Sequence, residues 1–238
     1  MPYYENPGML AIQYRVLAGF PVRVKRHLEV LLIDDGSPTS PAVDVPRPAA
    51  LPELRIYRVG VDIPWHQHGA RNLGAREANG PWLFMTDMDH VVPEDTWTRL
   101  LFLQLESDRM YTFNRVDAPH MRPTIDSRYG TPKPHPNTFL VSKELYWEAG
   151  GYDEDYCGTY GTDGMFRKRL AVTAMGRAQL PLNIIRYSRD VIPDASTRTL
   201  PRKEGRKKGD KKQIRLRKIA EGREDAITTL AFPWQRVL

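Results

Sequence analysis

The most constraining feature of this sequence is a short apolar run that ends at two carboxylates. Residues 82–85 read Trp-Leu-Phe-Met, and Asp87 and Asp89 follow directly. An unbroken apolar run of this length predicts a strand buried on both faces, as in the parallel sheet of an α/β protein. Open α/β sheets bind ligands at the carboxyl ends of their strands, where two carboxylates offer oxygen ligands to Mg²⁺ or Mn²⁺. The motif alone is equally compatible with a solvated turn.

Strand-like and helix-like segments alternate along most of the chain. Strands are expected at 28–33, 54–59, 82–85, 110–113, 138–141 and 182–187, and helices at 6–19, 70–78, from 93, 142–149, 163–172 and 211–220. Two proline-rich segments, 38–52 and 117–137, are expected to be irregular. This alternation predicts an α/β fold with a mostly parallel central sheet flanked by helices. We expect one domain over residues 1–190 and a basic C-terminal extension over 191–238.

The charge of the chain is unevenly distributed. Of 238 residues, 35 are Lys or Arg and 29 are Asp or Glu, which gives a net charge of +6. Residues 198–223 contain twelve Lys or Arg and three acids, a local charge of +9, so the remainder sums to −3. This basic segment either contacts a polyanion or is a solubilising tail. A single cysteine, no long apolar run and no signal-like start lead us to expect a cytoplasmic protein.

Five motifs occur in a defined order. They are Pro2-Tyr3-Tyr4-Glu5-Asn6, Ile33-Asp34-Asp35-Gly36-Ser37, Ala70-Arg71-Asn72-Leu73-Gly74, Thr86-Asp87-Met88-Asp89, and Gly150-Gly151-Tyr152 continuing to Thr162-Asp163 and Arg169. Together they resemble the family-2 glycosyltransferases of GT-A fold over roughly residues 2–175. The resemblance implies a metal-dependent, inverting transfer of a sugar from a nucleoside diphosphate, with a UDP-sugar favoured, to an acceptor hydroxyl. The acceptor, a glycan, protein, lipid or modified nucleic acid, is left open.

The same resemblance assigns roles to individual residues. It implies a nucleoside pocket with Pro2, Tyr4, Glu5 and Asp35, a diphosphate region with Arg71, Asn72 and Asp87, a Mn²⁺ or Mg²⁺ site with Asp87 and Asp89, and Asp163 as the general base. Asp34 is expected to brace the Gly36 turn instead of contacting ligand. His90 is expected to project away from the metal. The sequence departs from the family at Thr162, where the family often has Glu.

A second departure lies at the start of the sequence. The family's first strand precedes the Pro-Tyr-Tyr motif, but here only Met1 does. Without that central strand, two strand edges are left exposed. We therefore expect a chain of this length to be less stable or less active than one extended by about ten apolar residues.

Other interpretations remain open at this stage. His66 and His68 form an i, i+2 pair that resembles a metal site, although no third ligand lies near them in the sequence. Residues 84–91 resemble a phosphatase nucleophile motif only locally. A non-catalytic protein of nucleotide-sugar-binding fold, or a nucleic-acid-binding protein that acts through residues 198–223, is the alternative to an enzyme.

Overall fold

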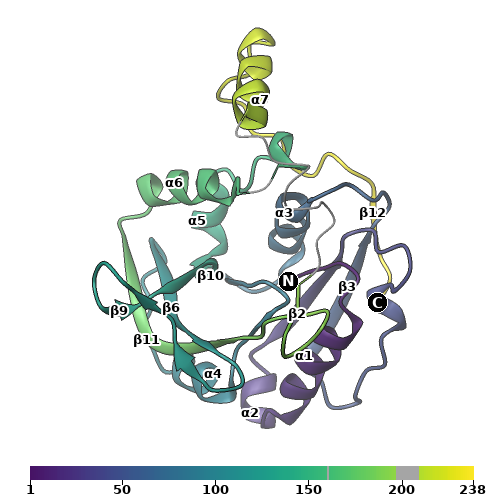
Figure 1. The fold of residues 1–238 in the computed structure, drawn as a ribbon, viewed down its shortest axis with the longest axis vertical. Helices are drawn as coiled ribbons and strands as arrows, with labels where there is room; N and C mark the ends of the chain where they lie inside the picture. Colours follow the sequence, from purple (N-terminus) through teal and green to yellow (C-terminus); the bar gives the residue numbers. More distant parts are fainter. Residues whose placement is uncertain (160, 197–208) are drawn as a thin grey trace.

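The computed structural model describes residues 1–159, 161–196 and 209–238. Two β-sheets form its centre, and helices cover their faces (Figure 1). The helices are α1 (Pro7–Gly19), α2 (Val22–Lys25), α3 (Gln67–Glu77), α4 (Glu94–Leu100), α5 (Lys143–Glu148), α6 (Asp163–Thr173) and α7 (Gly209–Ala220), with 3-10 turns η1 (Ala42–Asp44) and η2 (Glu154–Tyr156). The strands are β1 (Pro2–Tyr3), β2 (Glu29–Asp34), β3 (Glu53–Val59), β4 (Trp82–Met85), β5 (His90–Val91), β6 (Arg109–Asp117), β7 (Arg122–Pro123), β8 (Ile125–Asp126), β9 (Thr131–Pro132), β10 (Pro134–Ser142), β11 (Gly176–Arg186) and β12 (Trp234–Arg236).

The first sheet has the order β1-β2-β3-β12. β2 and β3 run parallel, as the sequence predicted, β1 adds a short parallel strand that was not predicted, and β12 pairs antiparallel with β3. Successive residues of β2 point to opposite faces. Leu32 packs in the cluster that includes Leu10 of α1, and Ile33 packs in the cluster that includes Leu73 of α3. The two helices therefore cover opposite faces of this sheet.

The second sheet has the order β4-β10-β6-β11-β5 and corrects the prediction of a mostly parallel sheet. Only β6 and β11 pair in parallel, and the other neighbours in this order are antiparallel. A parallel pair needs a crossover connection that returns the chain to the same end of the sheet. The segment between β6 and β10 holds only the short strands β7, β8 and β9, so the chain returns in the opposite direction. β10 returns the chain to the end of the sheet at which β6 begins, and α5 and α6 then connect β10 to β11 at that end.

Two apolar clusters fix the helices on the second sheet. Phe139 of β10 and Met85 of β4 pack with Leu145 of α5 and Phe166 of α6. On the opposite face, β4, β6 and β11 contribute to a cluster that includes Leu100 of α4. The sheet is thus enclosed by α5 and α6 on one side and α4 on the other.

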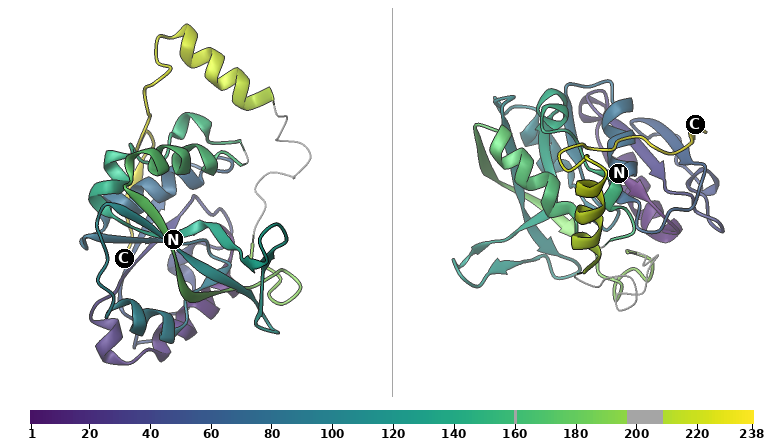
Figure 2. Two further views of the ribbon diagram at one scale, coloured as in Figure 1. Left: turned by 90° about the vertical axis from the view of Figure 1, so that its left-hand side faces the viewer. Right: turned by 90° about the horizontal axis from the view of Figure 1, so that it is seen from above.

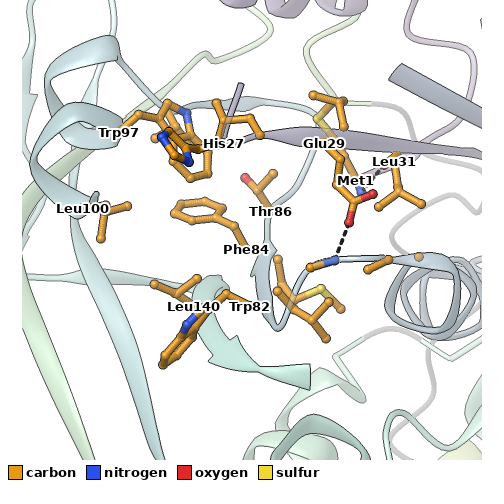
Figure 3. Close-up of a pocket in the computed structure, with 18 of the residues that line it drawn as sticks. Met1, His27, Glu29, Leu31, Trp82, Phe84, Thr86, Trp97, Leu100 and Leu140 are labelled. Carbon is orange, nitrogen blue, oxygen red and sulfur yellow. Dashed lines mark hydrogen bonds between the residues drawn. The ribbon is translucent and has the colours of Figure 1, made fainter. Parts of the chain in front are cut away.

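A pocket of about 590 Å³ lies between β2 and β4 (Figure 3). β1 pairs only with Ile33 and Asp34, so it covers the end of β2 and leaves residues 29–31 half-buried. β4 pairs with β10 on one edge, and in the described part of the chain no strand pairs with its other edge. An apolar groove therefore lies between the two sheets, beside the unpaired parts of β2 and β4.

The C-terminal part of the chain contributes to the fold. β12 is the edge strand of the first sheet, and Phe232 packs with Tyr57 and Val59 of β3. α7 agrees with the helix expected at 211–220 and stands away from the sheets (Figure 2). The segment that we expected to be an extension thus supplies both a strand and part of a core. No helix in the described ranges combines the length and apolar character needed to cross a bilayer.

Candidate active site

The first turns of α3, together with the residue before the helix, carry three side chains that each pair with a different acid. The pairs are His66 with Asp35, His68 with Asp163, and Arg71 with Asp87. Asp35 follows β2, Asp87 follows β4, and Asp163 begins α6. Residues i and i+2 of a helix point about 200° apart. His66 and His68 therefore reach different acids and do not form the shared metal pair considered above.

Asp35 is buried at the amino end of α3. Its Oδ1 lies 2.8 Å from Nδ1 of His66, and both side chains are buried. The ring of Phe232 packs edge-on against His66, with 4.3 Å between ring centroids. Burial raises the pKa of Asp35, and the contact with His66 opposes that rise. His66 thus helps Asp35 to retain its charge.

The residues before α1 contact the loops that follow β2 and β3. Pro2 lies in β1, and Tyr4 donates a hydrogen bond of 3.0 Å to Asp62. Burial, assisted by Asp62, raises the pKa of Tyr4 to about 12. One carboxylate oxygen of Glu5 accepts hydrogen bonds of 2.9 and 3.0 Å from two backbone amides of the loop after β2, so Glu5 also holds this loop in place. Asp34 accepts two more from this loop, at 2.9 and 2.8 Å, which confirms its expected bracing role.

Arg71 is a buried cation between two acids of the site. It pairs with Asp87, donates to the backbone oxygen of Asn137 at 3.1 Å, and lies over the ring of Tyr152. Burial works against its charge, but Asp87, Tyr152 and Asp163 outweigh this effect and raise its pKa. Arg71 therefore remains charged, and its orientation is fixed by several partners.

Asn72 is fully buried, and its side chain is used within the protein. Its amide nitrogen donates to Tyr152 O at 2.7 Å and to Glu154 Oε1 at 2.9 Å. Its oxygen accepts from the Tyr146 hydroxyl at 2.8 Å and the Tyr152 amide at 2.9 Å. Gly151 has a φ of +62°, and a Cβ there would approach Asn72 Oδ1 to 2.9 Å. These contacts hold Asn72 in a fixed position between α3 and the segment that contains Gly151, Tyr152 and Glu154.

Asp163 is the first residue of α6 and is largely enclosed. Its Oδ1 lies 3.7 Å from His68 Nε2, and that nitrogen is closer to the Thr162 hydroxyl, at 3.1 Å. Burial alone would raise the pKa of Asp163, but His68, Arg71 and Asn137 together lower it to about 2. The carboxylate is therefore ionised at neutral pH and able to accept a proton.

A second cluster joins Asp87 to two histidines. His90 and His135 stack with 3.8 Å between ring centroids, and His135 Nε2 lies 3.8 Å from Asp87 Oδ2. Asp87, His90 and His135 each offer one ligand atom within 4.8 Å of the others. Asp89 Oδ1 lies 2.7 Å from His90 Nδ1. The structure corrects the expectation that His90 projects away from this region.

The apolar pocket adjoins part of the acidic region. Arg71, Thr86 and His90 are among the residues that line it, whereas Asp35 and Asp163 are not. Its other walls are mainly apolar side chains of β2, β4 and α4, as Figure 3 shows. The pocket therefore adjoins the acid-rich site without containing it.

Sequence reasoning missed several residues of this site. His66, His68, His90, His135 and Phe232 contact the predicted acids directly or through one neighbour. The histidines were visible in the sequence, because each lies close to a predicted acid or to a strand end. Phe232 gave no signal, because its contact with His66 depends on the return of the C-terminal segment to the first sheet.

The basic segment 198–223 lies partly outside the described residues, which resume at Gly209. In the described part, Lys218 is buried and pairs with Asp153 at 2.5 Å and with Asp155 at 3.1 Å. Arg223 also pairs with Asp155, at 3.0 Å. At least two of the basic side chains thus hold the chain together, which weakens the alternative of a free polyanion-binding tail.

The chain has the architecture of an α/β protein of the GT-A type. Asp35 follows a parallel strand of the first sheet, the second sheet is mixed, and side chains at one end of α3 pair with the acids of the site. Residues 16–160 match the model of Glycosyl transferase family 2, and the chain belongs to this family. The predicted resemblance is confirmed. No curated protein matches the sequence.

Solved structures share the fold. S. aureus TarS 1-349 is 16% identical, with a TM-score of 0.61, and the match covers 82% of this chain and 61% of that one. TarS 1-349 in complex with UDP-GlcNAc is also 16% identical, with a TM-score of 0.62, over 79% of this chain and 57% of that one. The chain thus spans about three fifths of the length of these TarS structures.

Proposed function

We propose that this protein transfers a sugar from a nucleoside-diphosphate sugar to an acceptor hydroxyl, with inversion at the anomeric carbon and with help from a divalent cation. The observation that carries the proposal is the pairing of Asp35, Asp87 and Asp163 with side chains at one end of α3. Membership of a glycosyltransferase family and a solved TarS complex with UDP-GlcNAc support it. A UDP-sugar is the favoured donor.

The nucleoside side of the donor is assigned to Asp35, Tyr4 and Pro2. Asp35 accepts a hydrogen bond from an imide nitrogen of a uracil-type base, and Tyr4 packs on the ring. Both side chains belong to the end of the first sheet at which its parallel strands finish. That end is the usual ligand site of such sheets. His66 supports the assignment because it holds Asp35 in a fixed position.

The diphosphate is assigned to Arg71 and a divalent cation near Asp87. Arg71 is a permanently charged partner for phosphate oxygens. The donor set fits a cation, because Asp87 supplies a carboxylate and two histidines stand beside it. When bound, the ion stabilises the charge that develops on the departing diphosphate.

In the transfer step the acceptor oxygen forms a bond to the anomeric carbon while the bond from that carbon to the diphosphate oxygen breaks. The hydroxyl proton passes to the carboxylate of Asp163, and the bonding electrons leave with the nucleoside diphosphate. A single displacement inverts the anomeric centre. Asp163 is ionised at neutral pH and therefore starts the step as a proton acceptor. Its position at the start of α6 and near Arg71 supports this role.

The proposal is tested with a panel of nucleotide sugars and acceptor hydroxyls in the presence of Mn²⁺ or Mg²⁺. We expect Asp163→Asn to lower turnover about 10²-fold or more, because loss of a general base typically costs ~10² to 10⁴. Asp95→Asn is the control, because Asp95 is exposed and, among the residues that the structure describes, forms an ion pair with Arg99 alone. NMR of the product is expected to show the inverted anomer. Equal turnover in both variants, or a retained anomer, contradicts the proposed mechanism.

A further inference from the structure

We propose that Asp87, His90 and His135 bind the divalent cation, and that Asp89 holds His90 in place instead of serving as the main ligand. This assignment deepens the proposed function and depends on it for the role of the ion. It changes the residues expected from the sequence, which placed the cation between Asp87 and Asp89. It also brings in a histidine from the proline-rich segment 117–137.

The three side chains are nearly close enough to share an ion. Their ligand atoms lie within 4.8 Å of one another, and His135 Nε2 is 3.8 Å from Asp87 Oδ2. Two ligands that are each about 2.1 Å from one ion lie at most about 4.2 Å apart. The three ligand atoms must therefore move closer together before all of them reach coordination distance.

Both imidazoles are oriented by a partner on Nδ1. His90 Nδ1 lies 2.7 Å from Asp89 Oδ1, and His135 Nδ1 lies 3.1 Å from the Thr138 hydroxyl. Metal-binding histidines usually have their second nitrogen held by a carboxylate or another acceptor. In both residues Nε2 is the nitrogen left for a ligand.

The Nε2 atom of His90 is buried and lacks a hydrogen-bond partner among the described residues. His90 as a whole is 1% exposed. Buried polar atoms are almost always hydrogen bonded, so an unpaired one requires an explanation. An ion beside Asp87 supplies that partner and removes the cost of leaving this atom unsatisfied.

The carboxylate of Asp87 has one oxygen for each of two partners. Arg71 binds Oδ1 of Asp87 and leaves Oδ2 for the ion.

The donor set selects the type of ion. One carboxylate and two imidazoles favour a transition metal such as Mn²⁺ over Mg²⁺, which prefers oxygen ligands. An ion held by these three protein atoms would leave room for water or phosphate oxygens. The cluster therefore predicts Mn²⁺ binding in the absence of donor, with two histidine nitrogens coordinated.

Pulsed EPR of Mn²⁺ bound to the unmodified protein, without nucleotide, tests this directly. We expect modulation from two ¹⁴N nuclei, which changes when the histidines carry ¹⁵N. Isothermal titration with Mn²⁺ is expected to show a loss of affinity of at least 10-fold for His90→Gln and for His135→Gln. Asp89→Asn is expected to weaken binding about 10- to 100-fold through His90, as such supporting residues typically do. His120→Gln is the control, because His120 is exposed in the same segment as His135.

The results of these experiments distinguish a failure of the proposed cation site from a failure of the proposed glycosyl transfer. Absence of histidine nitrogen from the Mn²⁺ spectrum, or unchanged affinity in both histidine variants, overturns the site even if Mn²⁺ still supports transfer. Two coordinated nitrogens without turnover of any nucleotide sugar support the site and count against the proposed function. Equal loss of affinity in the His120 variant would show a general effect of the segment and overturn the assignment.

Discussion

His66 and Asp35 are 31 residues apart in the chain, yet His66 Nδ1 lies 2.8 Å from Asp35 Oδ1. The contact joins the helix α3 to the end of β2. It depends on a close approach at Gly69, where an added Cβ would be 2.1 Å from His66 Nε2 and 2.6 Å from Phe232 Cε1. The glycine thus keeps the space that the His66 ring needs to reach Asp35.

Gly69→Ala is expected to destabilise the protein although alanine favours helices by about 1 kcal/mol over glycine. The new methyl group must displace the buried rings of His66 and Phe232, and overpacking of this kind costs about 1–3 kcal/mol. The matched control is Gly74→Ala in the same helix, because its Cβ would meet nothing closer than 3.7 Å, at Ile33. Urea unfolding measures both. A stabilised Gly69 variant contradicts the tight contact described here.

Lys218→Met tests whether the C-terminal helix belongs to the fold. The substitution leaves Asp153 and Asp155, both nearly buried, without the ammonium group that pairs with them. Removing one partner of a buried ion pair costs about 3–5 kcal/mol. Lys212→Met, at an exposed position of α7, is expected to change stability by less than about 0.5 kcal/mol. Similar unfolding midpoints for the two variants would show that α7 contributes little to stability.

The low pKa of Asp163 makes stability depend on pH in the acid range. Its pKa falls from 3.8 to about 2 on folding, so the folded protein favours the ionised form. This contribution, about 2 kcal/mol, is present above pH 3.8 and is lost as the pH falls through 2. We expect Asp163→Asn to lose stability at pH 6 but to show a weaker decline than the parent between pH 4 and 2. Identical pH profiles of the free energy of unfolding would exclude this linkage.

Strands with a clear local pattern were predictable, because an apolar run and a period-two alternation each leave a direct mark on the sequence. Residues 82–85 and 54–59 are examples. β12 was not predictable, since Trp-Gln-Arg has no clear pattern and becomes a strand only through pairing with β3. The direction of β10 depends on how the segment after β6 returns, which a local pattern does not encode.

The site was predictable to a similar extent. Motifs located the acids Asp35, Asp87 and Asp163, because strand and helix ends place them in recognisable contexts. They did not reveal which side chains pair with these acids. His90 was misjudged because the chain turns between β4 and β5, so the alternation of a strand does not continue through Asp89. His135 is close to Asp87 only because β10 pairs with β4.

The apolar groove between β2 and β4 predicts that an added strand will stabilise the fold. Pro2 pairs with Ile33, so residues placed ahead of Met1 continue in register beside Leu31, Val30 and Glu29. About five apolar residues there would pair with β2 and cover β4, a length typical of strands. If the extension contributes about 1–3 kcal/mol, the melting temperature rises by roughly 2–10 °C for a chain of this size.

The matched control is an extension of equal length made of Ser and Gly. Both extensions convert the terminal amine of Met1 into an amide, and burial of that amine lowers its pKa to about 5. A difference between the two therefore reports the apolar strand itself. Hydrogen exchange is expected to slow at the amides of residues 82–85 only with the apolar extension. Equal melting temperatures and equal exchange would show that the groove does not accept a strand, because a paired strand must protect the free edge of β4.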